Sequence, residues 1–526
     1  MSNPVFPGSA ASAGIAASPG TAASPDIAAS PDITAVASSA GPATIPGSTD
    51  EYPPLGELQT ASLREELTRL DDLIAGRVFS PGEPGWDEAR TAWNLAVDQR
   101  PVAVVIPEHV DDIAHTVAMA RALGLGVAPQ GTGHNAGPLV AENGLADAIL
   151  LRTSQLRGVQ VDADQRVARV EPGALWGDVV AAVSPHGLAA LAGSSHDVGV
   201  VGYTLGGGLS WLARSHGLAA NQVLAVELVT ADGQQRRVDA EHDPELFWAV
   251  RGGGGDFGIV TAMEFRLFPI AEIVAGTLFW PLDRSEDVLQ AWAEWTASVP
   301  DSVKSVGRVL RFPPMPELPP FLSGKSFVVV EAAIQESPER ADELLAPLRA
   351  LGPDMDSVHP QPVAELLQLH MDPPAPVPGY GDGMLLRELS PAAVRAFVDA
   401  VGPDSDCALL SAEIRHVGGA ATPDAAYASA PERQAPEPGA VAGLDAEYLV
   451  FGVGIAIPGS GDALAASLGR LLSRVEPWRA RLDYLNFAEH ERSAERIFGD
   501  RVHRLRALKR LIDPTRVIRS NHPVSR

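Results

Sequence analysis

The sequence is almost without cysteine, since Cys407 is the only one among its 526 residues. A single thiol cannot close an internal disulfide, and it cannot supply a cysteine-based metal cluster. Such a composition is typical of a reducing compartment. We therefore expect a cytoplasmic protein, with export left open by the unusual N-terminal segment.

Basic residues are also scarce. The chain has 40 Lys and Arg residues against 66 Asp and Glu residues, a formal net charge of −26. No run of Lys or Arg reverses this balance locally, so we expect no nucleic-acid partner and no anionic membrane partner. No apolar stretch is long enough to span a bilayer.

The first basic residue, Arg64, follows a segment rich in Ala, Ser, Pro and Gly with "AASPG" and "AASPD" repeats. Without a basic start and an apolar core, this segment does not match a secretory signal. Its regular prolines and few large apolar residues predict a disordered, low-complexity tail over residues 1–50.

Several catalytic motifs are missing. No glycine segment gives the strand, G-x-G-x-x-G and helix order of a Rossmann site, and GxxxxGK[ST] is absent. The G-x-S-x-G elbow of serine hydrolases and the HExxH helix of metalloproteases are absent too. The histidines lack metal-ligand spacing, so we expect no metal site.

The remaining chain divides by pattern into three parts. Residues 58–269 alternate strand-like and helical segments, which predicts a mixed α/β domain. Residues 270–481 combine strands such as "SFVVVEAAI" and "ALLSAEIRHV" with amphipathic helices, which predicts an antiparallel sheet covered by helices on one face. Residues 482–526 read as a strand, two helices and a proline-terminated tail. Pro-rich stretches, including the one that holds Tyr380, are expected to be loops around a cleft.

Three glycine-rich segments lie in the first domain: "QGTGHN" (130–135), "GSSHDVGVVGYTLGGGLSW" (193–211) and "RGGGGDFGIVT" (251–261). Glycine lets backbone N–H groups approach a ligand closely, and successive N–H groups bind phosphate oxygens. Each segment alone is explained by a tight turn. Three together favour a long, phosphate-bearing cofactor.

The order of "RPVAVVIP", "QGTGHN", "GALWGDV", "VGVVGYTLGGGLSW", "ELFWAVRGGGGDFGIVT", "YLN" and "DPTRVIRSN" resembles the FAD-linked oxidases related to berberine bridge enzyme. That family has the vanillyl-alcohol-oxidase fold with a PCMH-type FAD domain. The resemblance covers about residues 86–524. It implies an α+β fold, with a two-part FAD-binding domain over 58–269, an antiparallel-sheet substrate domain over 270–481 and a C-terminal segment, 482–526, that returns to the FAD domain.

The resemblance also assigns roles to single residues. His134 matches the histidine that the family bonds to the flavin 8α carbon, although Gln130 and Thr132 depart from the R-G-G-G-H pattern. Ser195 stands where relatives with a second covalent bond have cysteine, and Cys407 is expected far away, on a strand of the substrate domain. One link is therefore expected, through His134. The cofactor-binding residues implied are His134, Gln130, Gly131, Thr132, Gly133, Asn135, Ser195, Asp197, Val198, Gly199, Gly202, Tyr203, Gly206, Gly207, Gly208, Gly255, Gly258, Ile259, Val260, Asn486 and Asn521.

Val198 matches the position that controls oxygen access to the flavin in the family. A small valine there is associated with oxidases and a bulkier residue with dehydrogenases. The alternative is that Val198 is a packing residue.

The catalytic candidates are Tyr484, Arg415 and Glu413. Tyr484 belongs to the family's Y-x-N motif and is expected to be the catalytic base or to position the substrate. A tyrosine needs a nearby cation to act as a base, which Arg415 or His416 would supply. Glu413 and Arg415 share one face of a predicted strand, and that face is either at the flavin or a salt-bridged surface. Tyr380 is either a substrate contact or a loop anchor.

The resemblance therefore implies an FAD-dependent oxidase that takes a hydride from an alcohol, sugar or secondary metabolite and passes the electrons to O2, giving H2O2. Two alternatives remain. One is a flavin dehydrogenase with a different electron acceptor, and the other is a flavin-binding protein without catalysis.

Overall fold

The computed structural model describes residues 57–525, apart from 142–144, 315–319 and 430–436. The predicted disordered tail, residues 1–50, lies outside this range. The described chain begins with helix α2 (Glu57–Leu73), at the point where the sequence predicts the first folded residues. No helix in the described ranges combines the length and the apolar character needed to cross a membrane.

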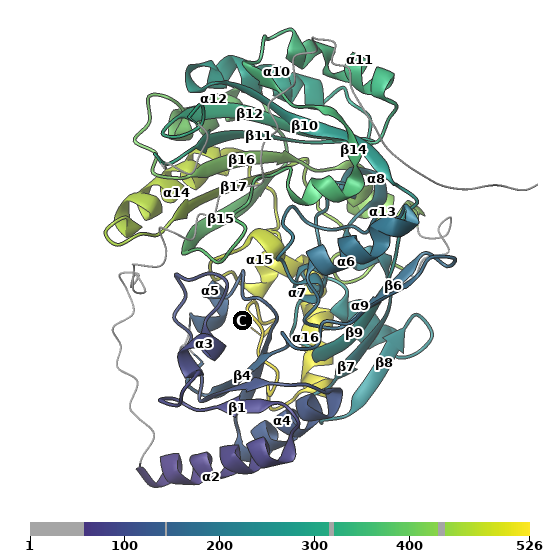
Figure 1. The fold of residues 1–526 in the computed structure, drawn as a ribbon, viewed down its shortest axis with the longest axis vertical. Coiled ribbons are helices and arrows are strands. Elements are labelled where there is room, and N and C mark those ends of the chain that lie inside the picture. The colour runs from purple at the N-terminus through teal and green to yellow at the C-terminus, as the bar shows by residue number, and fades with distance from the viewer. Residues whose placement is uncertain (1–56, 142–144, 315–319, 430–436, 526) are drawn as a thin grey trace, which may run out of the picture.

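The first half of the chain builds two small sheets, in the lower half of Figure 1. The four-stranded sheet has the order β1-β2-β4-β3, with β2, β4 and β3 parallel. Its elements are β1 (Arg77–Phe79), α3 (Trp86–Arg90), β2 (Ala103–Ile106), α4 (Val110–Leu123), β3 (Gly126–Gln130), α5 (Gly137–Val140) and β4 (Ala148–Arg152).

The second sheet is five-stranded and antiparallel, with the order β5-β6-β9-β7-β8. The predicted hairpin is confirmed, and Gly233 lies in its turn with a φ of 80°. The elements are β5 (Val159–Asp162), β6 (Val167–Val170), α6 (Trp176–Val183), η1 (Ser184–His186), α7 (Val200–Leu205), α8 (Ala213–His216), η2 (Ala219–Gln222), β7 (Val223–Val229), β8 (Gln235–Asp239), α9 (Pro244–Val250) and β9 (Ile259–Arg266).

The large sheet is eight-stranded and antiparallel, and it lies above the two small ones in Figure 1. Its order is β13-β10-β12-β11-β16-β17-β15, and β14 pairs with β10. The strands are β10 (Glu272–Pro281), β11 (Val303–Arg311), β12 (Ser326–Ile334), β13 (Met355–Asp356), β14 (His359–Pro362), β15 (Gly379–Leu386), β16 (Ser411–His416) and β17 (Tyr448–Ile455).

Helices cover one face of this sheet, as the sequence predicts. They are α10 (Ser285–Thr296), α11 (Pro338–Arg349), α12 (Pro391–Val401) and α14 (Gly461–Val475). Trp292 and Phe397 from these helices pack on Ala412 and Ile414 of β16 in one apolar core. The other face of the sheet meets the glycine-rich half of the chain. The α+β architecture expected from the sequence is confirmed.

The elements of this half of the chain are joined by short helices: η3 (Leu282–Arg284), η4 (Val363–Leu367), η5 (Gly419–Ala421), α13 (Pro423–Ser429) and η6 (Glu476–Trp478).

The C-terminal residues lie against the small sheets, drawn in yellow in Figure 1. They form η7 (Leu485–Phe487), α15 (Ala494–Phe498), η8 (Gly499–Arg501) and α16 (Val502–Ile512). The strand predicted in residues 482–526 is wrong for the described chain, because Tyr484 leads into a 3-10 turn. Beyond α16, Ile518 forms a parallel bridge with Val127 of β3.

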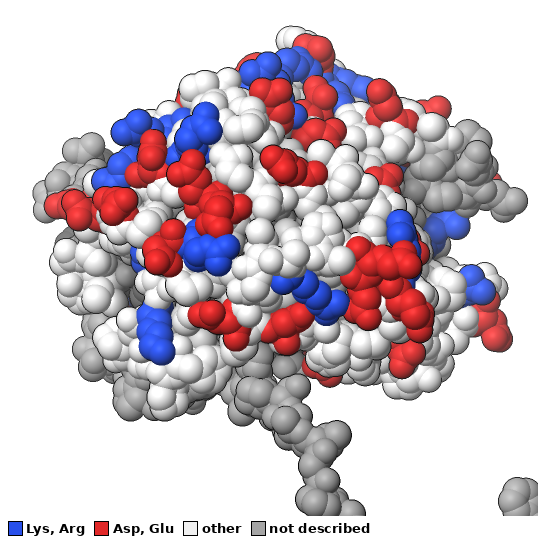
Figure 2. Space-filling model, turned by 90° about the horizontal axis from the view of Figure 1, so that it is seen from above, with Lys and Arg blue, Asp and Glu red and all other residues white. Residues whose placement is uncertain are grey.

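The outer face of the helical layer is shown in Figure 2. Acidic and basic side chains are interspersed on it, and they come mostly in adjacent pairs of opposite sign. Examples on α11 and beside α10 are Arg340 with Glu343 (2.7 Å) and Arg284 with Asp287 (2.6 Å). Exposed pairs of this kind contribute little to stability but keep the surface solvated.

Candidate functional site

The loop after β3 fixes His134 between an aromatic ring and a carboxylate. Trp93 stacks on the imidazole, with ring centroids 4.0 Å apart and an interplanar angle of 17°. Thr132 Oγ1 lies 2.7 Å from His134 Nδ1, and Asp197 Oδ1 lies 3.5 Å from Nε2. Gly133 takes a φ of 85°, which allows the loop to turn between Thr132 and His134. A lone histidine in a glycine loop is thus held on three sides.

Asp197 is the negatively charged residue among the side chains that surround His134. Burial alone would raise its pKa, but the nearby His134 and the hydrogen bonds from Ser195 and Trp93 outweigh that effect and lower the pKa to about 2. Ser195 Oγ donates to Asp197 Oδ1 at 2.7 Å, and Trp93 Nε1 donates to Oδ2. The carboxylate is therefore charged at neutral pH and favours a proton on Nε2 of His134.

Gln130, which departs from the family pattern, is buried at the end of β3 and turned away from His134. Its carbonyl oxygen accepts hydrogen bonds from Arg152 Nη1 at 2.8 Å and Gln99 Nε2 at 3.2 Å, and its Nε2 donates to Gln99 Oε1 at 2.7 Å. Gln130 thus anchors the base of the loop, and nothing in its contacts places its side chain at the flavin.

The three glycine segments differ in what they face. A Cβ on Gly131, Gly199, Gly202 or Gly255 would meet no atom closer than 3.9 Å, so each opens on unfilled space. A Cβ on Gly206 would overlap Asn486 Oδ1, at 1.8 Å, and one on Gly207 would press on the Tyr484 ring, at 2.9 Å. Side chains of the protein therefore pack directly against the Gly206–Gly208 run. The open glycines line the space that we call the cradle: Gly131, Gly199, Gly202 and Gly255.

The glycine segments include buried polar atoms with no hydrogen-bond partner among the described residues, such as Asn135 Oδ1 in the first segment and Arg251 Nη1 in the third. Buried polar groups are nearly always paired, so both atoms point to a missing ligand. An acceptor, a buried cation and glycines that open on space fit a cofactor with phosphates and a polar ring, such as FAD. Arg251, Asn135 and the backbone of the four open glycines would hold it.

The C-terminal segment brings the Y-x-N residues to the second glycine segment. Asn486 Nδ2 donates to the Tyr203 carbonyl at 2.9 Å, and Asn521 Nδ2 donates to the Asn135 carbonyl at 3.4 Å. Tyr484 is 3% exposed, and burial raises the pKa of its hydroxyl well above the usual range. A phenol in this state is a proton donor at neutral pH.

Glu413 and Arg415 stand on the face of the large sheet that lies opposite the helices. Val306 pairs with both Glu331 and Arg415, and Arg308 pairs with Glu413, so these side chains share that face. His370, which follows η4, inserts between them. This buried charged cluster consists of Arg308, Glu331, His370, Glu413 and Arg415.

The cluster is tightly connected. Arg415 Nε donates to Glu413 Oε1 at 2.6 Å, and the Arg415 guanidinium lies 5.0 Å over the Phe487 ring, in the same turn as Asn486. Although burial raises the pKa of Glu413, Arg415 and His370 outweigh it and hold that pKa far below its usual range. Although burial lowers the pKa of His370, Glu331 raises it, to about 9. Glu413 is therefore a fixed anion and a weak base.

The structure corrects three expectations about single residues. His416 points to the helical face, where it stacks on Tyr448 with centroids 5.5 Å apart, so it cannot assist Tyr484. Burial and nearby Arg214 lower its pKa to about 2. Tyr380 belongs to strand β15, paired with Gly454, and is not a loop residue. Cys407 lies before β16, not on a strand, and packs on the helical side of the sheet.

The other residues that the resemblance assigns to the cofactor site are mostly packed against protein. Tyr203 is mostly enclosed, and its hydroxyl donates to the Leu191 carbonyl at 3.1 Å. Val198 is half-buried against the core of the second small sheet. Ile259 and Val260 point into two different apolar cores, and a Cβ on Gly258 would meet Leu228 at 2.5 Å, so their side-chain positions are filled by protein.

Sequence reasoning missed Trp93, Arg308, Glu331 and His370. A signal existed for two of them, because Arg308 and Glu331 interrupt apolar strands with a charge. Trp93 and His370 lie in segments without regular periodicity, so only the tertiary structure brings them to the site.

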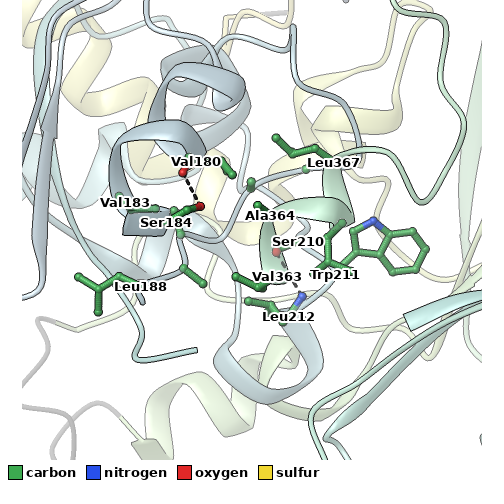
Figure 3. A pocket seen from close by; sticks show the side chains of 15 residues that line it. Val180, Val183, Ser184, Leu188, Ser210, Trp211, Leu212, Val363, Ala364 and Leu367 are labelled. Atoms are coloured by element: carbon green, nitrogen blue, oxygen red, sulfur yellow. Dashed lines mark hydrogen bonds between the residues drawn. The ribbon is translucent and has the colours of Figure 1, made fainter. Parts of the chain in front are cut away.

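An apolar pocket lies between α6, the 188–193 segment and η4, and no residue of the His134 loop lines it. Figure 3 shows Val180 and Val183 on one side and Val363 and Leu367 on the other. Its two serine hydroxyls are engaged locally, Ser184 with the Val180 carbonyl and Ser210 with the Leu212 N–H. Nothing in this lining can move a proton, so the chemistry belongs to the cradle and the charged cluster.

Comparisons with known proteins agree with this geometry. Residues 101–239 match the FAD binding domain family. An FAD-linked oxidoreductase of Dictyostelium discoideum is 26% identical over 474 residues, which are 88% of this chain and 97% of that protein. (R)-6-hydroxynicotine oxidase of Paenarthrobacter nicotinovorans is 33% identical over 214 residues, which are 40% of this chain.

The share covered differs among these relatives. The match spans 46% of the hydroxynicotine oxidase, about half its length. Among solved structures, the berberine-bridge-enzyme-like protein 1 of Physcomitrella patens superposes with a TM-score of 0.74 and 20% identity, over 87% of this chain and 98% of that one. Fold, glycine cradle and sequence relatives agree that the chain is an FAD-linked oxidoreductase, and its fold is similar to that of the berberine-bridge-enzyme-like proteins.

Proposed function

We propose that this protein is an FAD-dependent oxidase that removes a hydride equivalent from an alcohol, sugar or secondary metabolite, with O2 as the electron acceptor and H2O2 as the second product. The observation that carries the proposal is the juxtaposition of an open glycine cradle with a buried charged cluster and a buried tyrosine. When bound, FAD supplies the hydride acceptor that no amino-acid side chain provides.

The chain's own residues have three tasks. Tyr484, a phenol at neutral pH, donates a hydrogen bond to the substrate oxygen and so orients the carbon that loses the hydride. The hydroxyl proton leaves to solvent and is recovered in H2O2. Arg415, fixed by Glu413 and placed over the Phe487 ring, lowers the cost of negative charge beside that tyrosine. The two apolar cores that enclose Tyr484 and the large sheet exclude water from the reacting atoms.

A single covalent link to the cofactor through His134 forms part of the proposal. Its support is the held orientation of the imidazole and the lack of a second candidate thiol. Ser195 offers a hydroxyl that is engaged with Asp197, and Cys407 packs on the far face of the large sheet.

Two named relatives support an oxidase. They are (R)-6-hydroxynicotine oxidase and the glucooligosaccharide oxidase of Sarocladium strictum, the latter 34% identical over 215 residues. The half-buried Val198 beside Asp197 is a small residue, as expected for an oxidase.

A dehydrogenase is the second candidate, because structural relatives include both activities. The pollen protein Phl p 4 is described as a glucose dehydrogenase, and its isoleucine-to-valine variant as a glucose oxidase. One substitution thus separates the two activities in that protein.

The test uses the yellow holoenzyme without oxygen, exposed to a panel of alcohols, sugars and phenolic metabolites. We expect at least one compound to bleach the flavin absorbance, and readmitted O2 to restore it with stoichiometric H2O2. Recovery with a quinone but not with O2 would establish the dehydrogenase. If no compound bleaches the flavin, the protein binds the cofactor without this catalysis.

A further inference from the structure

The buried charged cluster carries an excess of positive charge. Both ring nitrogens of His370 face carboxylate oxygens, with Nδ1 2.6 Å from Glu331 and Nε2 2.8 Å from Glu413. His370 Nε2 also lies 2.9 Å from Arg415 Nη2. Although burial lowers the pKa of the ring, Glu331 raises it to about 9, so the imidazole is charged at neutral pH. Two arginines and one imidazolium thus face two carboxylates, and every member is at least 92% buried.

Lys304 adds a fourth basic group on the same face of β11. Its side chain is 3% exposed, and Nζ has no hydrogen-bond partner among the described residues. Burial and the neighbouring Arg415 and Arg214 hold the pKa of this amine well below its usual range, and Glu413 opposes them only in part. Burying a polar group without a partner costs free energy, so such a group calls for an explanation.

A second buried lysine in the same chain provides the comparison. Lys509 is 5% exposed, and its Nζ contacts the Asp256 carbonyl at 2.6 Å, Asp513 at 2.8 Å and the Ile518 carbonyl at 3.0 Å. That amine is fully used by the fold. The protein thus supplies three hydrogen-bond acceptors to the Lys509 amine and none, among the described residues, to the Lys304 amine.

The other charged groups nearby do not fill this role. Arg214 is a cation engaged with Asp301 and with the carbonyls of Val303 and Val417. Asp372 accepts from Ser194 Oγ at 2.8 Å and is half-buried. Its charge also acts on Arg415 and offsets part of the positive charge of the cluster, but it does not hydrogen-bond to Lys304. Lys304 Nζ therefore lacks a hydrogen-bond acceptor among the described residues.

We propose that the substrate is an organic acid, whose carboxylate binds at Lys304 and Arg415 while the hydroxyl to be oxidised faces Tyr484. This inference rests on the proposed function and narrows its substrate class to hydroxy acids. A carboxylate neutralises the surplus charge of the cluster and gives the Lys304 amine its hydrogen-bond acceptor, since charge-assisted hydrogen bonds are the strong ones. A neutral alcohol leaves both unsatisfied.

The experiment compares matched pairs in which a hydroxymethyl group replaces the carboxylate: glucuronate with glucose, and mandelate with 1-phenylethane-1,2-diol. We expect a hydroxy acid to bleach the holoenzyme's flavin without oxygen at least about tenfold more efficiently than its neutral counterpart. Neutral compounds that bleach the flavin equally well or better would overturn the acid subsite and leave the proposed oxidase intact.

Lys304→Met tests the assignment to a residue, with Lys325→Met as the control because Lys325 is exposed. We expect Lys304→Met to raise KM for the acid about tenfold, with KM for the neutral counterpart and the control variant unchanged. The melting temperature should stay the same or rise, because an unpaired buried amine is replaced by an apolar chain. A fall of several degrees would show a structural role and overturn the proposal.

A binding measurement keeps the proposal testable if no compound bleaches the flavin, a result that would refute the proposed oxidase. Acetate and benzoate are then titrated into the holoenzyme while the visible flavin spectrum is recorded. We expect a saturable spectral change that Lys304→Met abolishes. If these anions leave the spectrum unchanged, or if the variant responds as the unaltered protein does, the subsite is refuted.

Discussion

Trp93 and Asp197 are joined by a hydrogen bond from the indole Nε1, and together they enclose the imidazole of His134. The indole covers the ring face, and the carboxylate lies 3.5 Å from Nε2. Since the two residues are 104 positions apart in the chain, the orientation of His134 depends on the docking of the segment around Trp93 against the second glycine-rich segment.

Asp197→Asn should slow covalent attachment of the flavin roughly tenfold, because an amide no longer favours the Nε2-protonated tautomer of His134. The yield is measured as flavin colour that stays with acid-precipitated protein after expression for different times. Ser195→Ala is the matched control, since it removes only one donor to Asp197. Equal yields in the two variants would contradict this role of the carboxylate.

His134→Ala should leave the acid-precipitated protein colourless while the native protein still binds FAD by the cradle. Retained colour in the pellet would move the covalent link to another residue. Loss of both covalent and reversible FAD binding would instead show that His134 is needed for the fold of the loop.

Tyr484→Phe should lower kcat about 10²-fold with a smaller change in KM, because it removes the hydrogen bond that orients the substrate oxygen as the hydride leaves. Tyr380→Phe is the control, since Tyr380 lies on β15 and its ring contacts His490 at 5.2 Å. The comparison is made by anaerobic stopped-flow reduction of the flavin. An unchanged reduction rate in Tyr484→Phe would remove the tyrosine from the mechanism.

Val198→Leu should slow reoxidation of the reduced flavin by O2 severalfold, while reduction by substrate keeps its rate. The reason is steric, because a larger side chain narrows the approach beside Asp197. Val180→Leu, in the apolar pocket of Figure 3, serves as the control for a general packing change. Identical reoxidation in all three proteins would make Val198 a packing residue only.

Glu489 should make stability depend on pH. Burial and the nearby Asp382 raise its pKa to about 7 from a usual value of 4.5. The folded state therefore binds this proton more tightly, so the contribution is complete below pH 4.5 and is lost as the pH rises through 7. The loss is on the order of 3 kcal/mol.

Glu489→Gln should accordingly raise the free energy of unfolding at pH 8 and change it little at pH 4.5. Urea unfolding of the holoenzyme at the two pH values measures this, with the exposed Glu286→Gln as the control. Parallel pH profiles for the native protein and Glu489→Gln would show that another group controls this range.

Local patterns predicted much of the fold. The β7–β8 hairpin follows from Asp232-Gly233 between two apolar runs, and β16 from the alternation that places Glu413 and Arg415 on one face. Which face meets the cofactor half did not follow, because that depends on where four distant helices pack. His370 was missed for the same reason, since its partners come from three strands.

Strand β15 shows why composition misled. Glycines and prolines around Tyr380 predicted a loop, since both residues are rare in strands. In the structure Gly381 and Gly383 leave room for Glu489 and Phe487, and a Cβ at either position would meet atoms within 3.1 Å. The strand needs these glycines because another segment lies directly over it, and a single sequence does not show that contact.

The bridge between Val127 and Ile518 has a consequence for biogenesis. One wall of the cofactor cradle is made of residues almost four hundred positions downstream of the strand they cover. A nascent chain therefore exposes an incomplete cradle throughout most of its synthesis, and long-range contacts of this kind form slowly. Flavin binding therefore has to follow translation. Maturation of the enzyme depends on how long the incomplete four-stranded sheet stays unaggregated before the C-terminal segment pairs with β3.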